Sequence, residues 1–494
     1  MYTYSLQTLQ NPPHSAHLVQ RGLQSLVGGI LLSVDGYAYS VRRQTALEYD
    51  KGQLLKIAEK NEQLEIECLE KLVAIPTCYN KQHNLQPIIA QLTRIFEERG
   101  YEVQTFPTSG APVFVAEMNR GVDKTLMFYN HYDVQPEEPL EAWKSPPYNL
   151  SIRNERLYGR GVSDNKGPLV ANLFGVQSAF EAERKPKCNI RFIVEGEEEA
   201  GSIHLGEFCE AHPDVLRSNG CVWEEANAVP NERSKIYAGV KGDVYFELHA
   251  KGFSEDAHSG DAPIVINPAW RLVWALSTLK NKNEEVLIDG FYDNVVPPTE
   301  EELELFASYP PEEIKQYKQQ YNTDSFLLGR KGVEFWRELT LRPTCTICGL
   351  LAGWTGPGSK TVVGKEAMAK LDFRIVPNQK VKRVQKLLRE HLDRYGFSDI
   401  ETRLLTGYEP SRTPIDNPFI QLLAKIAKDF SGKEPILVPS NQGSGPAHLF
   451  GSYTPWAACG TFDPEANIHA PNESLRLNDL RHMTAFVAAI AIEL

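Results

Sequence analysis

The sequence predicts an α/β fold, with a mostly parallel, mixed sheet covered by helices and interrupted by a smaller α+β unit of split βαβ type. Between residues 101 and 225, apolar runs of strand length alternate with stretches of helical periodicity, which is the pattern of an α/β layer. Between residues 236 and 405, two strand–helix units follow one another, and this order indicates a small sheet with two helices on one face. Near residue 414 the first pattern resumes, so the chain is expected to leave the larger domain and return to it.

The larger domain is expected to begin with two helices. Helical periodicity runs from about Leu54 to Leu72, where Ile75-Pro76 stops it, and again from about Gln86 to Arg99. A further helix is predicted from Leu169 to Phe180. The strands predicted around these helices lie near residues 101–106, 125–129, 189–194 and 220–223.

The smaller domain is predicted from four strands and two helices. The strands are expected near residues 236–239, 244–248, 368–376 and 400–405, and the helices at 268–279 and 381–395. The stretch Gly290 to Arg342 is rich in Pro, Glu and Tyr and is expected to be an insertion into this domain. Helices at 418–430 and 478–494 return the chain to the larger domain. The predicted domains are therefore 51–236 with 413–494, and 237–412.

Residues 1–50 precede these patterns and carry polar sequence that contains Pro and Gln. They are expected to be either a poorly ordered extension or the product of a misassigned upstream start codon. The sequence leaves these two alternatives open.

Length and composition indicate an enzyme-sized globular protein. A chain of 494 residues exceeds one ordinary core, and its 42% hydrophobic content is ample for two or three. A net charge of -12 argues against nucleic acid or an anionic membrane as the main partner. The sequence contains no run of 18 apolar residues, so no membrane-spanning helix is expected.

Eight cysteines are scattered without a disulfide framework, which favours a reducing compartment and a cytoplasmic protein. Cys345 and Cys348 form a single C-x-x-C with no second pair. On a strand their sulfurs would point to opposite faces, so both are interpreted as packing residues.

The most informative segment is Asn130-His131-Tyr132-Asp133, which ends an apolar run of strand length. A strand that ends in His-x-Asp places an imidazole and a carboxylate on the same face at the sheet edge. Asp164 follows in a loop punctuated by glycines, directly before a predicted helix. These residues therefore bring metal-ligating groups to the places where sheets bind their ligands.

Three further segments add residues of the same chemistry. They are the acidic run Glu197 to Glu199 after a strand, the pair Glu224-Glu225 after another strand, and His469 near the C-terminus. Zinc and similar divalent ions accept both imidazole and carboxylate ligands. Five such groups suffice for two ions if one carboxylate bridges them, as in hydrolytic two-metal sites.

Each segment also has a simpler interpretation. A histidine at a strand end is usually a hydrogen-bonded structural residue, and Glu197 to Glu199 alone would usually be a solvated charge run. Asp164 before a helix could be its N-terminal capping residue. One metal centre explains all the segments together, whereas the simpler interpretations must all hold independently, so the metal centre is favoured.

Taken together, these motifs resemble those of the M20 metallopeptidases, which include carnosinase-like dipeptidases, aminoacylases and glutamate carboxypeptidases. The resemblance extends from about residue 60 to the C-terminus. It rests on His131-Tyr132-Asp133, the loop Gly159 to Asp164, Glu198-Glu199 before Gly201-Ser202, and His469. The family implies a zinc-peptidase-like catalytic domain with an inserted lid, through which two chains form a homodimer.

The resemblance also implies a ligand set for two divalent ions per chain, expected to be Zn²⁺, although Mn²⁺ or Co²⁺ suits the same ligands. Asp164 would bridge the ions, with Glu199 and His469 on one of them. His131 and Glu224 would complete the other. Glu224 is favoured because it follows Trp223, but spacing to Gly239–Gly242 fits Glu225, and the choice stays open. Asp133 would orient the His131 ring.

Further residues take part in catalysis or substrate binding by the same resemblance. Glu198 would take a proton from a water held between the ions and later deliver it to the leaving amine. His258 would reach into the partner's site and contact the oxyanion. Arg374 would bind the substrate carboxylate, beside a loop that contains Gly443 and Ser444. In dipeptidases this loop begins with Arg-Glu, which is absent here, so the carboxylate pocket is expected to differ.

The predicted function is hydrolysis of a peptide bond in a dipeptide or short peptide with a free carboxylate. An N-acyl-amino-acid deacylase is the alternative, since it would use the same metals and base. A remote alternative is an inactive binding protein on the same fold, against which the presence of Glu198 argues. The expected partners are therefore a small peptide or N-acyl amino acid and a second copy of the chain.

Overall fold

The computed structural model describes residues 4–8, 31–34, 37–43, 47–81, 83–227, 234–460, 463 and 465–494, and it describes 4–8, 31–34, 37–43, 79 and 224–227 by their backbone alone. The chain divides into two compact units, Met1–Tyr49 and Asp50–Leu494. In the first unit, β3 (Tyr37–Arg43) pairs antiparallel with β1 (Tyr4–Thr8) and β2 (Leu31–Val34). The expectation of a poorly ordered extension concerns mostly residues outside the described ones and stays a prediction.

The second unit contains an eight-stranded mixed sheet with the strand order β20-β11-β21-β10-β6-β9-β5-β4. The four central strands β21, β10, β6 and β9 run parallel, as do β20 and β11, and the other neighbours are antiparallel. The strands are β4 (Glu102–Phe106), β5 (Val113–Met118), β6 (Thr125–His131), β9 (Asn189–Glu195), β10 (Gly220–Asn227), β11 (Lys235–Tyr237), β20 (Ile436–Val438) and β21 (Trp456–Gly460). The predicted mixed, mostly parallel sheet is confirmed.

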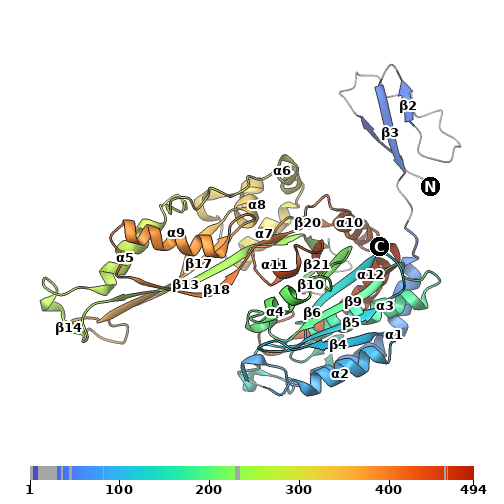
Figure 1. Cartoon of the computed structure of the whole chain (residues 1–494), viewed down its shortest axis with the longest axis horizontal. Coiled ribbons are helices and arrows are strands. Elements are labelled where there is room, and N and C mark those ends of the chain that lie inside the picture. Colours follow the sequence, from blue (N-terminus) through green and yellow to red (C-terminus); the bar gives the residue numbers. More distant parts are fainter. Residues whose placement is uncertain are drawn as a thin grey trace. The chain divides into compact units, whose positions relative to one another are not determined.

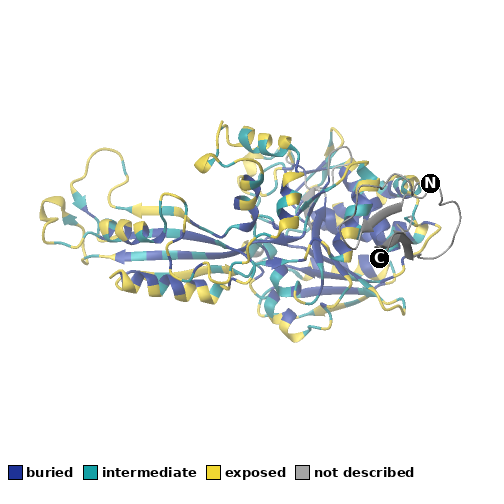
Figure 2. Cartoon of the chain, turned by 90° about the horizontal axis from the view of Figure 1, so that it is seen from above, coloured by how far each residue is buried: buried dark blue, intermediate teal, exposed yellow. Residues whose placement is uncertain are grey.

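Helices cover both faces of this sheet (Figure 1). On one face, α4 and α11 pack against Tyr129 and Trp223. On the other, Phe192 contacts Phe96 of α2 at 5.0 Å between ring centroids, and α1, α3 and α12 pack against one another. The helices are α1 (Lys51–Val73), α2 (Gln86–Glu97), α3 (Lys166–Glu181), α4 (Leu205–Ala211), α10 (Pro418–Ser431), α11 (Ala447–Phe450) and α12 (Leu477–Glu493). Figure 2 shows the strands between these helices as buried.

Local sequence explains where these helices begin and end. The Asp50 side chain accepts a hydrogen bond from the Gln53 backbone at the start of α1, and Asn417 caps α10, whose first residue is a proline. Gly432 ends α10 in a left-handed conformation, which glycine adopts without steric cost.

Among the residues described, no helix is both long enough and apolar enough to cross a membrane.

A second, antiparallel sheet has the strand order β15-β17-β13-β18. Its chain order is β13 (Gly242–Lys251), α5 (Pro268–Leu279), β15 (Thr344–Ala352), β17 (Glu366–Ile375), α9 (Val381–Arg394) and β18 (Glu401–Tyr408), which is a split βαβ arrangement. Buried side chains such as Phe246 and Phe373 form one core with Leu272 and Leu388 of the two helices. The predicted split βαβ unit is confirmed, and β15 adds an edge strand that was not predicted. The strand expected near residues 236–239 in this smaller domain belongs instead to the eight-stranded sheet, as β11.

Most of the stretch 290–342 lies elsewhere than predicted, whereas Phe291 at its start packs in the core of the smaller domain. It forms α6 (Glu300–Ala307), α7 (Pro311–Gln320) and α8 (Gly332–Leu341). Phe306, Tyr309 and Trp336 pack against Ile436 and Val438 of β20, so the stretch is anchored on the edge of the eight-stranded sheet rather than on the smaller one. Its aromatic side chains need an apolar partner to exclude water, and the edge strand β20 supplies one.

The interpretation of Cys348 as a packing residue is wrong. Cys345 is buried against the helices, but Cys348 is exposed on β15, because one face of this edge strand has no covering helix. The other cysteines are buried and none forms a disulfide.

Short elements complete the described chain. They are η2 (Tyr79–Lys81), η3 (Leu140–Ala142), β7 (Ser151–Arg153), β8 (Arg156–Tyr158), η4 (Glu198–Ala200), β12 (Gly239–Val240), β14 (Ala257–His258), η5 (Ser259–Asp261), η6 (Leu327–Gly329), β16 (Val362–Val363), β19 (Ser411–Arg412) and β22 (Ser474–Arg476).

Candidate metal centre

The candidate site lies at the carboxyl ends of two neighbouring parallel strands. β6 ends at His131, which is in register with Glu195 at the end of β9. β9 leads directly into η4, which carries Glu198 and Glu199. Asp164 lies two residues before α3 begins. The carboxyl ends of parallel strands meet at one edge of a sheet, so these segments converge although they are far apart in sequence.

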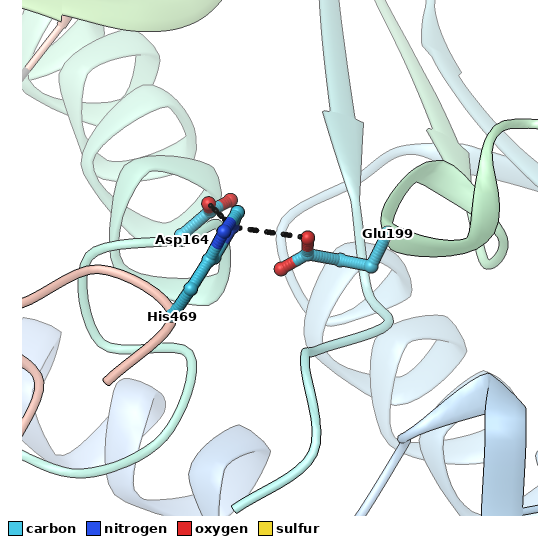
Figure 3. A group of neighbouring side chains, drawn as sticks. All are labelled: Asp164, Glu199 and His469. Carbon is cyan, nitrogen blue, oxygen red and sulfur yellow. Dashed lines mark hydrogen bonds and ion pairs between the residues drawn. The ribbon is translucent and has the colours of Figure 1, made fainter. Parts of the chain in front are cut away.

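Three side chains meet closely enough to hold a metal ion. Asp164, Glu199 and His469 each offer one ligand atom, and these atoms lie within 4.8 Å of one another. His469 Nε2 is 3.1 Å from Asp164 Oδ2 and 3.1 Å from Glu199 Oε2. Figure 3 shows the imidazole of His469 between the two carboxylates.

His131 approaches the same aspartate from its other oxygen. His131 Nε2 lies 2.8 Å from Asp164 Oδ1, whereas His469 faces Oδ2. Each carboxylate oxygen of Asp164 therefore has its own imidazole nitrogen. A carboxylate that bridges two ions, each with its own histidine, needs this arrangement, so the donor set fits two divalent ions.

Asp133 holds both the histidine and the glutamate turn in place. Its carboxylate is fully buried, and Oδ1 lies 3.2 Å from His131 Nδ1. The same carboxylate accepts backbone hydrogen bonds from Glu198, at 3.2 Å, and from Glu199, at 3.0 Å. A carboxylate partner on Nδ1 fixes the tautomer whose Nε2 can ligate a metal.

The charges of the cluster favour a cation at its centre. Hydrogen bonds to Asp164 and Glu199 raise the pKa of His469 to about 10. Burial opposes protonation of His131, but hydrogen bonds to Asp133 and Asp164 raise its pKa well above the usual value. Burial opposes ionisation of Asp164, but its hydrogen bonds to the two histidines hold its pKa below the usual value. A bound metal ion would displace the imidazole protons.

Glu473 fixes the loop that carries Asp164. This buried carboxylate accepts hydrogen bonds from Arg160 Nη1 at 2.8 Å and from the backbone of Gly161, Ser163 and Asp164 at 2.8–3.0 Å. Glu473 was not predicted to be a site residue. In the sequence, only its position four residues after His469 pointed to the site. One segment then supplies both a candidate ligand, His469, and the carboxylate that fixes the loop of another candidate ligand, Asp164.

Gln135 and Glu195 were also missed. Gln135 Nε2 donates to the carbonyl of Glu199 at 3.1 Å and to its Oε2 at 3.0 Å, so it orients a candidate ligand. Glu195 lies beneath the turn, where burial raises its pKa to about 7 and where it accepts hydrogen bonds from Tyr129 and Ser202. Only the position of Gln135, two residues after Asp133, pointed to the site.

Two of the simpler interpretations are wrong. The run Glu197 to Glu199 is not a solvated face, because Glu197 is buried and accepts a hydrogen bond from the backbone of His204 at 3.0 Å. Asp164 does not cap α3, since the cap position is Asn165 and the Asp164 side chain faces the two histidines.

The Glu224 and Glu225 side chains lie outside the described part of the structure. Their backbone continues β10 as far as Asn227, so the strand does not end at the acidic pair as expected. The choice between the two residues stays open.

Arg374 and Ser444 lie together. Arg374 Nη1 donates to Ser444 Oγ at 3.0 Å, and its Nε and Nη2 contact Asp372 at 2.9–3.1 Å. The Gly443 backbone donates to Asn441 Oδ1 at 3.1 Å. The Arg374–Ser444 bond therefore joins the four-stranded sheet to the loop after β20.

His258 lies apart from this cluster. It is exposed on β14, where its Nε2 lies 3.2 Å from Thr361 Oγ1, and Figure 1 shows β14 at the end of the four-stranded sheet that lies away from β6 and β9. In the described part of the chain, no hydrogen bond or ion pair joins His258 to Asp164, Glu199 or His469.

Comparisons with known proteins agree with the geometry. The model of "Peptidase family M20/M25/M40" matches residues 127–493. A human protein named Beta-Ala-His dipeptidase is 32% identical over 337 residues, which are 66% of this chain and 66% of that protein. A rat protein of the same name is 26% identical over 453 residues, covering 90% of this chain and 88% of that protein.

Solved structures give the same result. The M20 family metallo-carboxypeptidase of Sulfolobus solfataricus is 34% identical, with a TM-score of 0.79 over 87% of this chain and 98% of that one. Human carnosine dipeptidase 1 is 26% identical, with a TM-score of 0.71 over 90% of this chain and 99% of that one. The chain is therefore a hydrolase that belongs to peptidase family M20/M25/M40.

Proposed function

We propose that the chain is a dipeptidase that hydrolyses the peptide bond of substrates with a free carboxylate, using two divalent ions at the carboxyl ends of β6 and β9. The observation that carries this proposal is the position of Asp164 between His131 and His469, beside the turn that contains Glu198 and Glu199. In the described residues, no other three His, Cys, Asp or Glu side chains bring their ligand atoms within 4.8 Å of one another.

In this proposal, Asp164 would be shared by the two ions, His131 would hold one of them, and His469 and Glu199 would hold the other. Glu224 or Glu225 completes the first ion's ligands, and Zn²⁺ is the proposed metal because it accepts this mixture of nitrogen and oxygen donors. When bound, the ions supply Lewis-acid polarisation of the scissile carbonyl and lower the pKa of the attacking water. Asp133 and Gln135 keep the ligands in position.

Glu198 is the proposed general base and acid. Its neighbour Glu199 belongs to the candidate metal cluster, and the Asp133 carboxylate fixes the backbone of both glutamates. From this position, Glu198 takes the proton of the attacking water and then gives it to the nitrogen of the leaving amine. One carboxylate therefore performs both proton transfers.

The substrate class rests on the relatives and on Arg374. Relatives that match most of the chain are named Beta-Ala-His dipeptidase, and Arg374 with Ser444 provides donors for a carboxylate. The second candidate is a carboxypeptidase, because the Sulfolobus solfataricus structure at 34% identity carries that name.

A substrate panel separates these functions. We expect the zinc-loaded protein to cleave dipeptides such as β-Ala-His or Cys-Gly, and to leave N-acetyl amino acids and longer peptides unchanged. Release of free amino acid is measured for each substrate, with metal-stripped protein as the control. Removal of C-terminal residues from longer peptides would select the carboxypeptidase, turnover of N-acetyl amino acids alone would select a deacylase, and no metal-dependent turnover contradicts all three.

We also propose that the chain works as a homodimer through the smaller domain, within residues 237–412. Trp270 and Trp274 stack on the outside of α5 and are each about half exposed. Leu350 and Leu351 are equally exposed on β15, the edge strand beside α5. An open strand edge next to an exposed apolar helix face supports association with a second copy.

The free cysteines support a cytoplasmic location.

The proposed role of His258 in the partner subunit's site has a direct test. Neither His258→Ala nor Glu198→Gln protein is expected to turn over substrate efficiently. Co-expressed with different tags and purified as a heterodimer, the two chains should regain about half of the wild-type activity per dimer. One site then combines intact Glu198 with the partner's His258. If His258 acts within its own chain, both sites of the heterodimer lack a residue and activity stays at the level of the single variants.

A further inference from the structure

One edge of the Arg374 guanidinium group is hydrogen-bonded to a neighbouring carboxylate. Its Nε lies 3.0 and 3.1 Å from the two oxygens of Asp372, and its Nη2 lies 2.9 Å from Asp372 Oδ2. Both residues lie on β17, two positions apart, so they point to the same face of the sheet. Phe373 between them points the other way, into the core with α5 and α9. The pair therefore lies on the face without helices.

Some N–H donors of the Arg374 guanidinium remain for a ligand. A guanidinium group carries five N–H donors. Asp372 takes the one on Nε and one on Nη2, and Ser444 Oγ takes one on Nη1. One N–H remains on each terminal nitrogen. Donors on both terminal nitrogens can serve the two oxygens of a carboxylate, and the Arg374 side chain is 30% exposed, so a ligand can reach them.

We infer that Asp372 is a positioning residue for the substrate's carboxylate: it fixes the plane of the Arg374 guanidinium so that only the end formed by the two terminal nitrogens faces the substrate. This inference rests on the proposed function, in which Arg374 binds that carboxylate. Asp372 is suited to the task because its side chain is only 13% exposed. A flexible arginine would have to be ordered at each binding event, whereas this one is ordered beforehand.

A purely structural ion pair is the competing explanation, and the same domain contains one for comparison. On β18, Arg403 Nε donates to Glu401 Oε1 at 2.8 Å, again two positions apart. Both of those side chains are about half exposed, and in the described part of the chain neither forms a hydrogen bond or ion pair with the loop after β20. Glu401→Gln is therefore a matched control for the loss of a strand-face carboxylate beside an arginine.

The test compares Asp372→Asn with wild type on a cleaved dipeptide and on the same dipeptide as its C-terminal amide. For the free carboxylate we expect KM to rise about 10-fold with kcat changed less than about 3-fold, because a charge-assisted interaction is weakened before the chemical step. For the amide, neither constant should change by more than about 2-fold. Asp372→Glu keeps the charge and should recover most of the affinity. Glu401→Gln should behave as wild type with both substrates.

Arg374→Lys separates failure of this inference from failure of the proposed function. If Arg374→Lys weakens acid and amide equally, Arg374 does not bind the carboxylate, and both proposals about this residue fall. If Arg374→Lys discriminates between them and Asp372→Asn does not, only the role of Asp372 is overturned. Melting temperatures and metal content accompany each kinetic measurement. If Asp372→Asn is unfolded, Asp372→Glu decides: loss of affinity for acid and amide alike, with the fold retained, contradicts the inference.

Discussion

Replacement of Glu198 by glutamine is expected to lower kcat about 1,000-fold, within the range that general acid–base catalysis contributes, and to leave the metal content at two ions per chain. Glutamine keeps the shape of the side chain but cannot accept a proton from water. The Glu198 backbone hydrogen bond to Asp133 does not depend on the side chain, so the turn should stay intact. Steady-state kinetics and elemental analysis of the same preparations measure both parts of this prediction.

Glu199→Gln is the matched comparison, since it changes the neighbouring residue in the same turn. Glu199 belongs to the candidate metal cluster, so this variant should lose one ion and activity together. Two results would contradict the assigned roles: Glu198→Gln that loses metal, or Glu198→Gln that retains more than about a tenth of wild-type kcat. The first would make Glu198 a ligand, and the second would require another base.

The residues at strand ends were predictable because local sequence determines both their element and their position in it. The apolar run before His131 makes β6 a buried strand, and its last residue must then lie at the sheet edge. Asp133 is two residues further on, and the structure places it within 3.2 Å of that imidazole. Alternation of strands and helices predicted a largely parallel sheet. The structure shows β6 and β9 as parallel neighbours in it, which brings η4 to His131.

Contacts between distant segments were not predictable in the same way. Glu473 reaches the loop before α3 across more than 300 residues of sequence, and no local pattern identifies its partners. The helices of 290–342 are amphipathic, but periodicity does not say which of two sheets receives their apolar side chains. Cys348 shows the same limit, because burial of a strand face depends on whether a helix covers it. Each of these features depends on tertiary packing.

Replacement of Asp164 by asparagine is expected to remove both ions, whereas His131→Ala and His469→Ala should each remove one. Among the described residues, Asp164 alone faces both imidazoles, with a different oxygen toward each, and an amide offers one neutral oxygen in place of two charged ones. Apparent metal affinity should fall more than about 100-fold, beyond the 10- to 100-fold typical for loss of an outer-shell partner. Isothermal titration with Zn²⁺ gives the affinity and the number of ions bound by each variant.

A titration without metal tests the same geometry independently. In the metal-free wild type, the carboxylates of Asp164 and Glu199 raise the pKa of His469 to about 10, so its imidazole stays protonated at neutral pH. Asp164→Asn removes the first of these carboxylates and should lower the pKa of both His469 and His131, which nuclear magnetic resonance of the ring protons can follow. Zinc affinity of the wild type should rise with pH as these protons become easier to displace. An unchanged pKa of both histidines in Asp164→Asn would show that Asp164 does not lie between them, and the bridging role would then have to be given up.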